Sequence, residues 1–385
     1  MKTKMHNHLK TLLASALLLL STVCTAQSAQ NFRLKLQLND VADTLIISRL
    51  PFGSYHPESE DTVVTREGNI ERTFRINDPC YLLLTRPYHG GGMLQSASIL
   101  AVPGEQLAVT GTMESYRMQG SGIYRSIAAA NAVIQEFQDK SRIIFREFQK
   151  ASKSGDKQAM ETARTKAEAA NKALSAAFSA RSLAWIKAHP AEDGAATLFS
   201  GLNMEDLNTA LAAIDTKVRN GILKELIDAT LNRQQQKDTF KAAQERIRPG
   251  RQAPDFTLQD LSGRDFSLSA LRGRYVLLDF WGSWCGWCIK GMPKMKEFYA
   301  RYKDHVEIVG VDCSDTEAKW KAAVKEYALP WIHVYNGPKD GVDSRYAVNA
   351  YPTKILINPD GTINRVIVGE SEEFYQYMDN LFKSK

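Results

Sequence analysis

The segment that decides the fold reads Asp279-Phe280-Trp281-Gly282-Ser283-Trp284-Cys285-Gly286-Trp287-Cys288. The apolar run at residues 275–278 before it predicts a buried strand, which Asp279 interrupts. Residues 289–299 after it have apolar side chains at helical spacing, so we expect Cys285 to lie where the strand gives way to a helix. Free backbone N–H groups and the dipole at a helix N-terminus favour an anion, and they lower the pKa of a cysteine placed there. Cys285 and Cys288 therefore have the surroundings that thiol–disulfide exchange requires.

Length and composition indicate a globular protein of two or three domains. The chain has 385 residues, of which 44% are hydrophobic and 24% charged, and these are ordinary values. The formal net charge is +6, and three lysines in the first ten residues account for half of it. A charge of this size does not argue for nucleic acid or an acidic membrane surface as a partner. Five cysteines are too few for a disulfide-stapled scaffold of this length.

Residues 1–26 have the pattern of a secretory signal peptide. Residues 1–10 contain three lysines, and residues 11–20 form an apolar run. Cys24-Thr25-Ala26 has the small-x-small pattern of a cleavage site. The apolar run is short for a membrane span. We therefore expect a cleaved leader and a protein of the periplasm or cell envelope. Lipidation of Cys24 is the alternative, although residues 21–23 match the usual lipoprotein pattern poorly.

Three blocks follow the leader. Residues 27–122 are predicted to be β-rich, because residues 32–38 alternate strictly and further short apolar runs lie between turn signals. This pattern predicts a small sandwich or barrel. Residues 123–247 are predicted to be helical, with an antiparallel hairpin whose second helix Asp156 caps. The simplest role for this hairpin is structural, as a spacer or a surface against which other elements pack. The alternative is a role in dimerisation.

The last block, residues 248–385, alternates strand and helix patterns. Strands are predicted up to Trp281 and over residues 306–311, 331–334, 354–357 and 363–368, and the last two flank a hairpin turn at residues 358–361. Helices are predicted from Cys285, over residues 316–327 and from Glu372. These elements predict an α/β layer architecture.

Several separated motifs in this block together resemble the thioredoxin superfamily. They are Asp279-Phe280-Trp281, Trp284-Cys285-Gly286-Trp287-Cys288, Pro293 within the following helix, and Tyr351-Pro352-Thr353. The opening Ala253-Pro254-Asp255-Phe256 and the space for an inserted βα unit before Pro352 narrow the resemblance to TlpA-like and ResA-like thiol–disulfide oxidoreductases. The resemblance covers the last block. More loosely, the β-rich block is similar to an N-terminal domain that often precedes such modules.

The resemblance implies a role for several residues of these motifs, and the residue chemistry agrees with it. Cys285 would attack a substrate disulfide, and Cys288 would resolve the mixed disulfide. Asp279, with its pKa raised by burial, would exchange a proton with Cys288. Pro352 would follow a cis peptide bond and turn backbone groups toward a substrate peptide. An apolar rim around the sulfurs would consist of Trp284, Trp287 and Tyr351.

Two positions depart from the family pattern. Many ResA-like proteins carry a glutamate three residues after the second cysteine, where this chain has Gly291, so Asp279 would act alone or the proton step would differ. The cysteines also enclose Gly286 and Trp287 rather than a dipeptide ending in proline. Because the enclosed residues help to set the reduction potential, the direction of electron flow stays open.

We expect an exported thiol–disulfide oxidoreductase, and more specifically a reductase of protein disulfides or a protein of cytochrome c maturation. A membrane thiol donor would recharge it, and no bound cofactor or metal is expected, since Cys80 and Cys313 are isolated and expected to be buried and inert. Two alternatives stay open: a disulfide isomerase that forms a homodimer through the helical hairpin, and a non-catalytic cell-envelope binding protein with a passive thioredoxin module. Peroxidase chemistry is disfavoured, because Gly282 stands where it needs a threonine.

Overall fold

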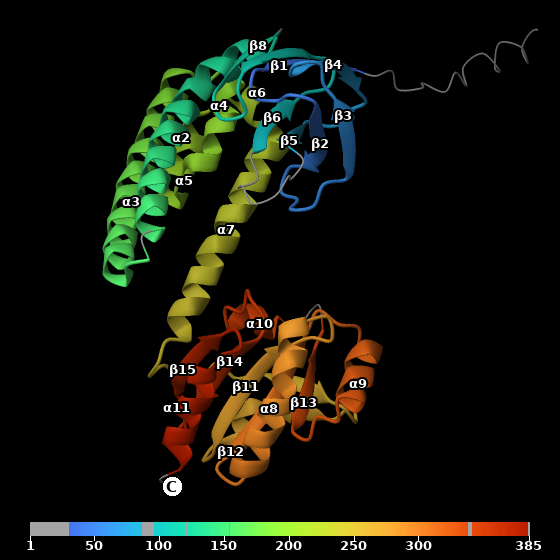
Figure 1. The fold of residues 1–385 in the computed structure, drawn as a ribbon, viewed down its shortest axis with the longest axis vertical. Coiled ribbons are helices and arrows are strands. Elements are labelled where there is room, and N and C mark those ends of the chain that lie inside the picture. The colour runs from blue at the N-terminus through green and yellow to red at the C-terminus, as the bar shows by residue number, and fades with distance from the viewer. Residues whose placement is uncertain (1–30, 87–95, 121, 154, 338–340, 384–385) are drawn as a thin grey trace, which may run out of the picture. The chain divides into compact units, whose positions relative to one another are not determined.

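The computed structural model describes residues 31–86, 96–120, 122–153, 155–337 and 341–383 (Figure 1). The chain divides into two compact units, Met1–Gln234 and Gln235–Lys385. The predicted signal peptide, including Cys24, lies outside the described residues. Among the helices of the described part, none is both long and apolar enough to cross a membrane.

In the described residues of the first unit, eight strands form two four-stranded sheets. One sheet has the order β4 (Asn69–Phe74), β1 (Phe32–Leu38), β7 (Gln106–Gly111), β8 (Tyr116–Gly120). The other has the order β3 (Ser59–Val64), β2 (Thr44–Pro51), β5 (Cys80–Thr85), β6 (Ser96–Ala101). Strand β1 buries every second residue, as its strict alternation predicted. The short apolar runs of this block, at residues 45–47, 81–84 and 99–101, lie in β2, β5 and β6.

Helices complete the first unit. The predicted hairpin is present as α2 (Tyr124–Ser152) and α3 (Lys157–Ala188), which pack along each other. The carboxylate of Asp156 caps α3 by accepting from the backbone N–H groups of Gln158 and Ala159 at 2.8 and 3.2 Å. The later elements are α4 (Gly194–Thr197), η1 (Leu198–Gly201), α5 (Met204–Ala213), α6 (Thr216–Arg219) and the start of α7 (Lys224–Arg246), whose residues after Gln234 belong to the second unit. One hydrophobic cluster runs from Phe32 to Ile227, so these helices and both sheets share a core.

The described part of the second unit is built on a seven-stranded sheet. Its order is β10 (Asp265–Ser267), β9 (Thr257–Asp260), β13 (Ile332–Asn336), β12 (Val306–Cys313), β11 (Tyr275–Trp281), β14 (Thr353–Ile357), β15 (Ile363–Val368). The three strands β11, β12 and β13 are parallel, and the remaining pairings are antiparallel. The predicted strands of this block are confirmed, and the short strands β9 and β10 were not predicted.

Helices and apolar clusters cover both faces of this sheet. The first cluster combines Leu277 and Trp281 of β11 with residues of α8 (Gly286–Tyr302), α9 (Glu317–Glu326) and α11 (Glu372–Phe382). The second combines Val276, Leu278 and Phe280 with residues of η2 (Leu268–Leu271) and α10 (Val342–Arg345). Since side chains alternate along a strand, Asp279 lies on the same face as Leu277 and Trp281, beneath α8. This α/β arrangement is the thioredoxin fold expected for the C-terminal region.

Candidate active site

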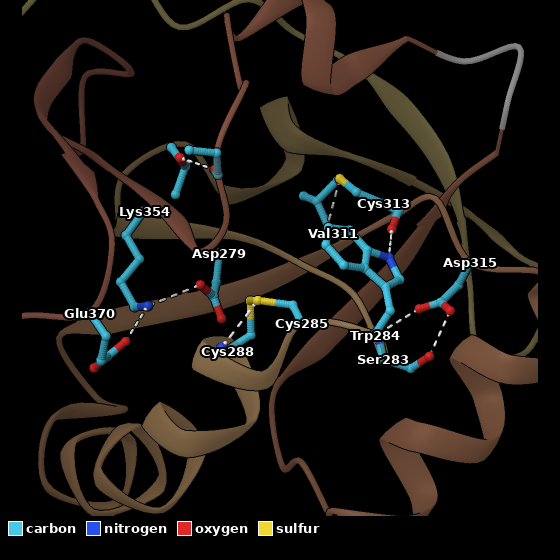
Figure 2. Close-up of a disulfide and its surroundings, with 12 residues drawn as sticks. Asp279, Ser283, Trp284, Cys285, Cys288, Val311, Cys313, Asp315, Lys354 and Glu370 are labelled. Carbon is cyan, nitrogen blue, oxygen red and sulfur yellow. Dashed lines mark hydrogen bonds and ion pairs between the residues drawn. A yellow bond between two sulfur atoms is a disulfide. The ribbon is translucent and has the colours of Figure 1, made fainter. Parts of the chain in front are cut away.

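Cys285 and Cys288 form a disulfide where β11 gives way to α8 (Figure 2). Their Cα atoms are 5.3 Å apart, and both side chains are buried. Cys285 is the N-cap of α8, and its Sγ accepts the backbone N–H of Cys288 at 3.2 Å. The helix N-terminus thus directs a donor and its dipole at the sulfur of Cys285, and both would stabilise a thiolate there after reduction.

The loop before Cys285 is fastened to the end of β12. Both the backbone N–H and the hydroxyl of Ser283 donate to the carboxylate of Asp315 at 2.6 Å. The indole Nε1 of Trp284 donates to the carbonyl oxygen of Cys313 at 2.9 Å. A Cβ atom at Gly282 would lie 2.4 Å from this Nε1 and 2.8 Å from this carbonyl oxygen. Glycine is therefore needed at 282 so that the indole can reach the strand end.

The residues of the predicted apolar rim differ in their packing and exposure. Trp284 is 52% exposed and packs edge-on against Tyr351, with ring centroids 5.1 Å apart. Trp287 is 65% exposed, and the Nζ of Lys290 lies 4.9 Å from its ring centroid. The peptide bond between Tyr351 and Pro352 is cis, as the resemblance implied. The carbonyl oxygen of Pro352 accepts from the N–H of Gly369 at 2.7 Å, which ties the start of β14 to the end of β15.

Asp279 has charged neighbours that come from outside the cysteine motif. The Nζ of Lys354 lies 3.4 Å from Oδ1 of Asp279 and 2.9 Å from Oε2 of Glu370. We call these three residues the buried ion triad; their side chains are 13% (Asp279), 3% (Lys354) and 16% (Glu370) exposed. A Cβ atom at Gly291 would lie 2.6 Å from the Glu370 carboxyl group. A second carboxylate therefore fills the space beside Gly291, but it comes from the segment after β15 instead of from α8.

Burial and the neighbouring charges set the proton affinities within the triad. Burial raises the pKa of Asp279 above its ordinary value; Lys354 opposes this effect and Glu370 adds to it. Burial would lower the pKa of the Lys354 ammonium, but the two carboxylates outweigh it, and the pKa of Lys354 is raised. Asp279 thus binds a proton more tightly than an exposed aspartate, beside a lysine that stays charged. No sequence motif includes Lys354 or Glu370, although a lysine in the apolar strand at 353–357 was a usable signal.

A second buried acid lies at the end of the neighbouring strand. Asp312 of β12 is 0% exposed, and in the described part of the chain neither of its carboxyl oxygens has a hydrogen-bond partner. Burial, followed by the nearby Asp315 carboxylate, raises the pKa of Asp312 to about 8. Asp312 is therefore mostly protonated in the folded protein at neutral pH, next to the residue that holds Ser283.

Because the pKa of Asp312 is raised, we expect the free energy of unfolding to fall as the pH rises. The folded pKa of about 8 exceeds the ordinary aspartate value of 3.8, so the stabilisation is complete below pH 4 and is lost as the pH rises to 8. One such group changes the free energy of unfolding by at most about 1.4 kcal/mol per pH unit. In urea denaturation at a series of pH values, Asp312→Asn should flatten this decline and be more stable than the parent at pH 8. Parallel curves for the two chains would contradict the assignment.

Comparisons with known proteins place the second unit in a family. The model of the AhpC/TSA family matches residues 249–366. The chain is 38% identical over 146 residues to thiol-disulfide oxidoreductase ResA of Bacillus cereus, covering 37% of this chain and 83% of that protein. It is 37% identical over 145 residues to the ResA of Bacillus subtilis, covering 37% and 80%. A solved thioredoxin domain of a thiol-disulfide oxidoreductase from Bacteroides vulgatus shares 32% identity, covers 35% of this chain and 98% of that one, and has a TM-score of 0.33.

The fold and the cysteine pair define the class, a thioredoxin-superfamily oxidoreductase with a dithiol centre. The chain belongs to the ResA/TlpA-like thiol–disulfide oxidoreductases, as its identity with ResA over more than two thirds of those proteins shows. The resemblance seen in the sequence motifs is thereby confirmed, and so is the expectation of an enzyme.

Proposed function

We propose that the chain is an exported reductase of protein disulfides that works through the Cys285–Cys288 pair. The observation that carries the proposal is the position of Cys285, whose sulfur caps α8 and accepts a helix N–H group. In the proposed roles Cys285 attacks, Cys288 resolves, and Asp279 relays a proton. The apolar rim and the cis bond at Pro352 support a substrate that is an extended, partly apolar peptide segment.

The proposed reaction begins with the reduced enzyme. The Cys285 thiolate attacks one sulfur of the substrate disulfide, so the substrate S–S bond breaks and the released thiolate takes a proton from solvent. Cys288 then passes its proton to the Asp279 carboxylate, and the Cys288 thiolate attacks Sγ of Cys285. The enzyme disulfide forms, the mixed disulfide breaks, and the second substrate thiolate takes the proton that Asp279 holds. Two electrons have moved from the enzyme dithiol to the substrate disulfide.

We also propose an export route, an electron donor and a domain organisation for the chain. The leader pattern at residues 1–26 supports export to the periplasm or cell envelope, where a membrane dithiol would re-reduce the enzyme and itself become a disulfide. Cytochrome c maturation is one process with such protein substrates. We also propose a β-rich domain at 27–122, a helical region at 123–247 and the thioredoxin-like domain at 248–385, and the hairpin of α2 and α3 is the candidate surface for a homodimer.

Two measurements on the full-length chain test the proposal. We expect the reduced protein to cleave insulin disulfides, and we expect its pair, equilibrated with glutathione buffers, to be more reducing than glutathione itself. Failure to cleave insulin would favour a passive binding module. A pair more oxidising than glutathione, together with repair of scrambled ribonuclease and a dimer in sedimentation, would make the protein an isomerase instead.

A further inference from the structure

We infer that Lys354 and Glu370 are positioning residues that set how strongly Asp279 holds the proton it receives from Cys288. The inference rests on the proposed function, because it acts through the roles of Asp279 and Cys288. It concerns two side chains that lie outside the cysteine motif and that none of the sequence motifs includes.

Three separate elements bring the buried ion triad together. Lys354 of β14 is the register partner of Asp279 of β11 in an antiparallel pair, so both side chains lie on the same face of the sheet. Glu370 follows β15, and the hydroxyl of Tyr375 of α11 donates to its Oε1 at 2.6 Å. Figure 2 shows the Lys354 ammonium between the two carboxyl groups, with the Asp279 carboxyl on the side of the disulfide.

Glu370 also reaches the helix that carries the cysteines. Its carboxyl group lies 2.6 Å from where a Cβ atom of Gly291 would be, and Gly291 follows Cys288 by one turn of α8. Gly291 has ordinary helical backbone, so the absence of its side chain matters for space and not for conformation. The missing side chain at Gly291 thus leaves space beside α8 for the Glu370 carboxylate, which pairs with Lys354.

The charges in the triad explain why both partners are needed. With Lys354 charged and both acids ionised, the triad carries one net negative charge, and proton transfer from Cys288 to Asp279 neutralises it. Without Lys354 two carboxylates would face each other, and Asp279 would hold a proton too tightly to release it. Without Glu370 the whole lysine charge would act on Asp279, which would become a poor acceptor. Together Lys354 and Glu370 keep the proton affinity of Asp279 between these two extremes.

Among the residues that the structure describes, the other titratable groups on the elements around Asp279 do not supply this charge. Gly310 of β12, its register partner on the other side, has no side chain, and His333 of β13 follows in the same row. Burial lowers the pKa of His333 to about 3, so its ring is neutral. Burial and Glu370 raise the pKa of Tyr375, which is neutral as well. Cys285, the N-cap of α8, and Cys288 of α8 are the reacting groups.

The experiment measures thiolate formation at Cys288 in the full-length, reduced Cys285→Ala chain. The rate of its alkylation by iodoacetamide is followed from pH 5 to 11, and the midpoint is compared among variants. Lys354→Met should lower the midpoint, because a more basic Asp279 accepts the proton of Cys288 more readily. Glu370→Gln should raise the midpoint, because Asp279 becomes a poorer acceptor, and each shift should be about one pH unit. Lys354→Arg keeps the charge and should stay near the parent. In an Asp279→Asn background both shifts should shrink, because Asp279 transmits them.

The opposite signs separate this role from a merely structural one. Lys321→Met removes a lysine from the exposed pair with Glu317 on α9, and it should leave the midpoint unchanged. Equal midpoints, shifts in the same direction, or shifts of full size in the Asp279→Asn background would overturn the inference. If Lys354→Met does not fold, as judged by circular dichroism, the raised midpoint of Glu370→Gln is required by itself. A parent chain that fails to cleave insulin refutes the proposed function, whereas an active parent with unmoved midpoints refutes only this inference.

Discussion

Replacing Cys288 by serine should stop turnover and leave the enzyme covalently joined to its substrate. Cys285 keeps its place as the N-cap of α8 in this variant, so its thiolate can still attack a disulfide. Serine cannot attack the resulting mixed disulfide, so turnover should fall on the order of 10³-fold or more. A non-reducing gel and mass spectrometry of the trapped species, with Cys285 as the linked residue, would check this expectation.

Two further variants make the trapping experiment decisive. Cys285→Ser should lose turnover without accumulating any adduct, because the attacking sulfur is gone. Cys80→Ser removes a buried thiol of the first unit and should behave like the parent. If Cys285→Ser formed adducts and Cys288→Ser formed none, Cys288 would be the attacking cysteine and Cys285 the resolving one.

The second large effect is expected for Asp279→Asn, which should slow resolution far more than the first attack. Asparagine keeps the shape of the side chain but cannot accept the proton of Cys288, and general base catalysis of this kind contributes about 10²-fold or more. Lys354 retains Glu370 at 2.9 Å, so its charge remains paired and the fold should persist. Stopped-flow tryptophan fluorescence, which follows formation and decay of the mixed disulfide separately, measures both rates.

A buried aspartate elsewhere provides the matched control for this variant. Asp312→Asn alters a carboxyl group of the neighbouring strand β12 that is not part of the triad, and it should leave the two rates nearly unchanged. If Asp279→Asn slowed attack and resolution by the same factor, the aspartate would stabilise the site without relaying a proton.

Elements whose signals are local were predictable from the sequence. Helix α8 begins after Cys285 because the apolar spacing of residues 289–299 is helical, and Asp156 caps α3 through its own neighbours. The central strand β11 was visible as an apolar run. By contrast, β3, β4 and β10 lie at the edges of their sheets, where few side chains are buried and no apolar pattern marks the strand.

The sequence by itself determined the dithiol chemistry, because Cys285 and Cys288 are close in the chain and one helix end holds them both. Only the tertiary structure brings together the charged groups of the proposed proton relay. Asp279, Lys354 and Glu370 meet through the pairing register of β11 with β14 and through the return of the chain after β15. The register between two distant strands depends on how the whole sheet packs, so no local sequence pattern predicts that Lys354 will lie opposite Asp279.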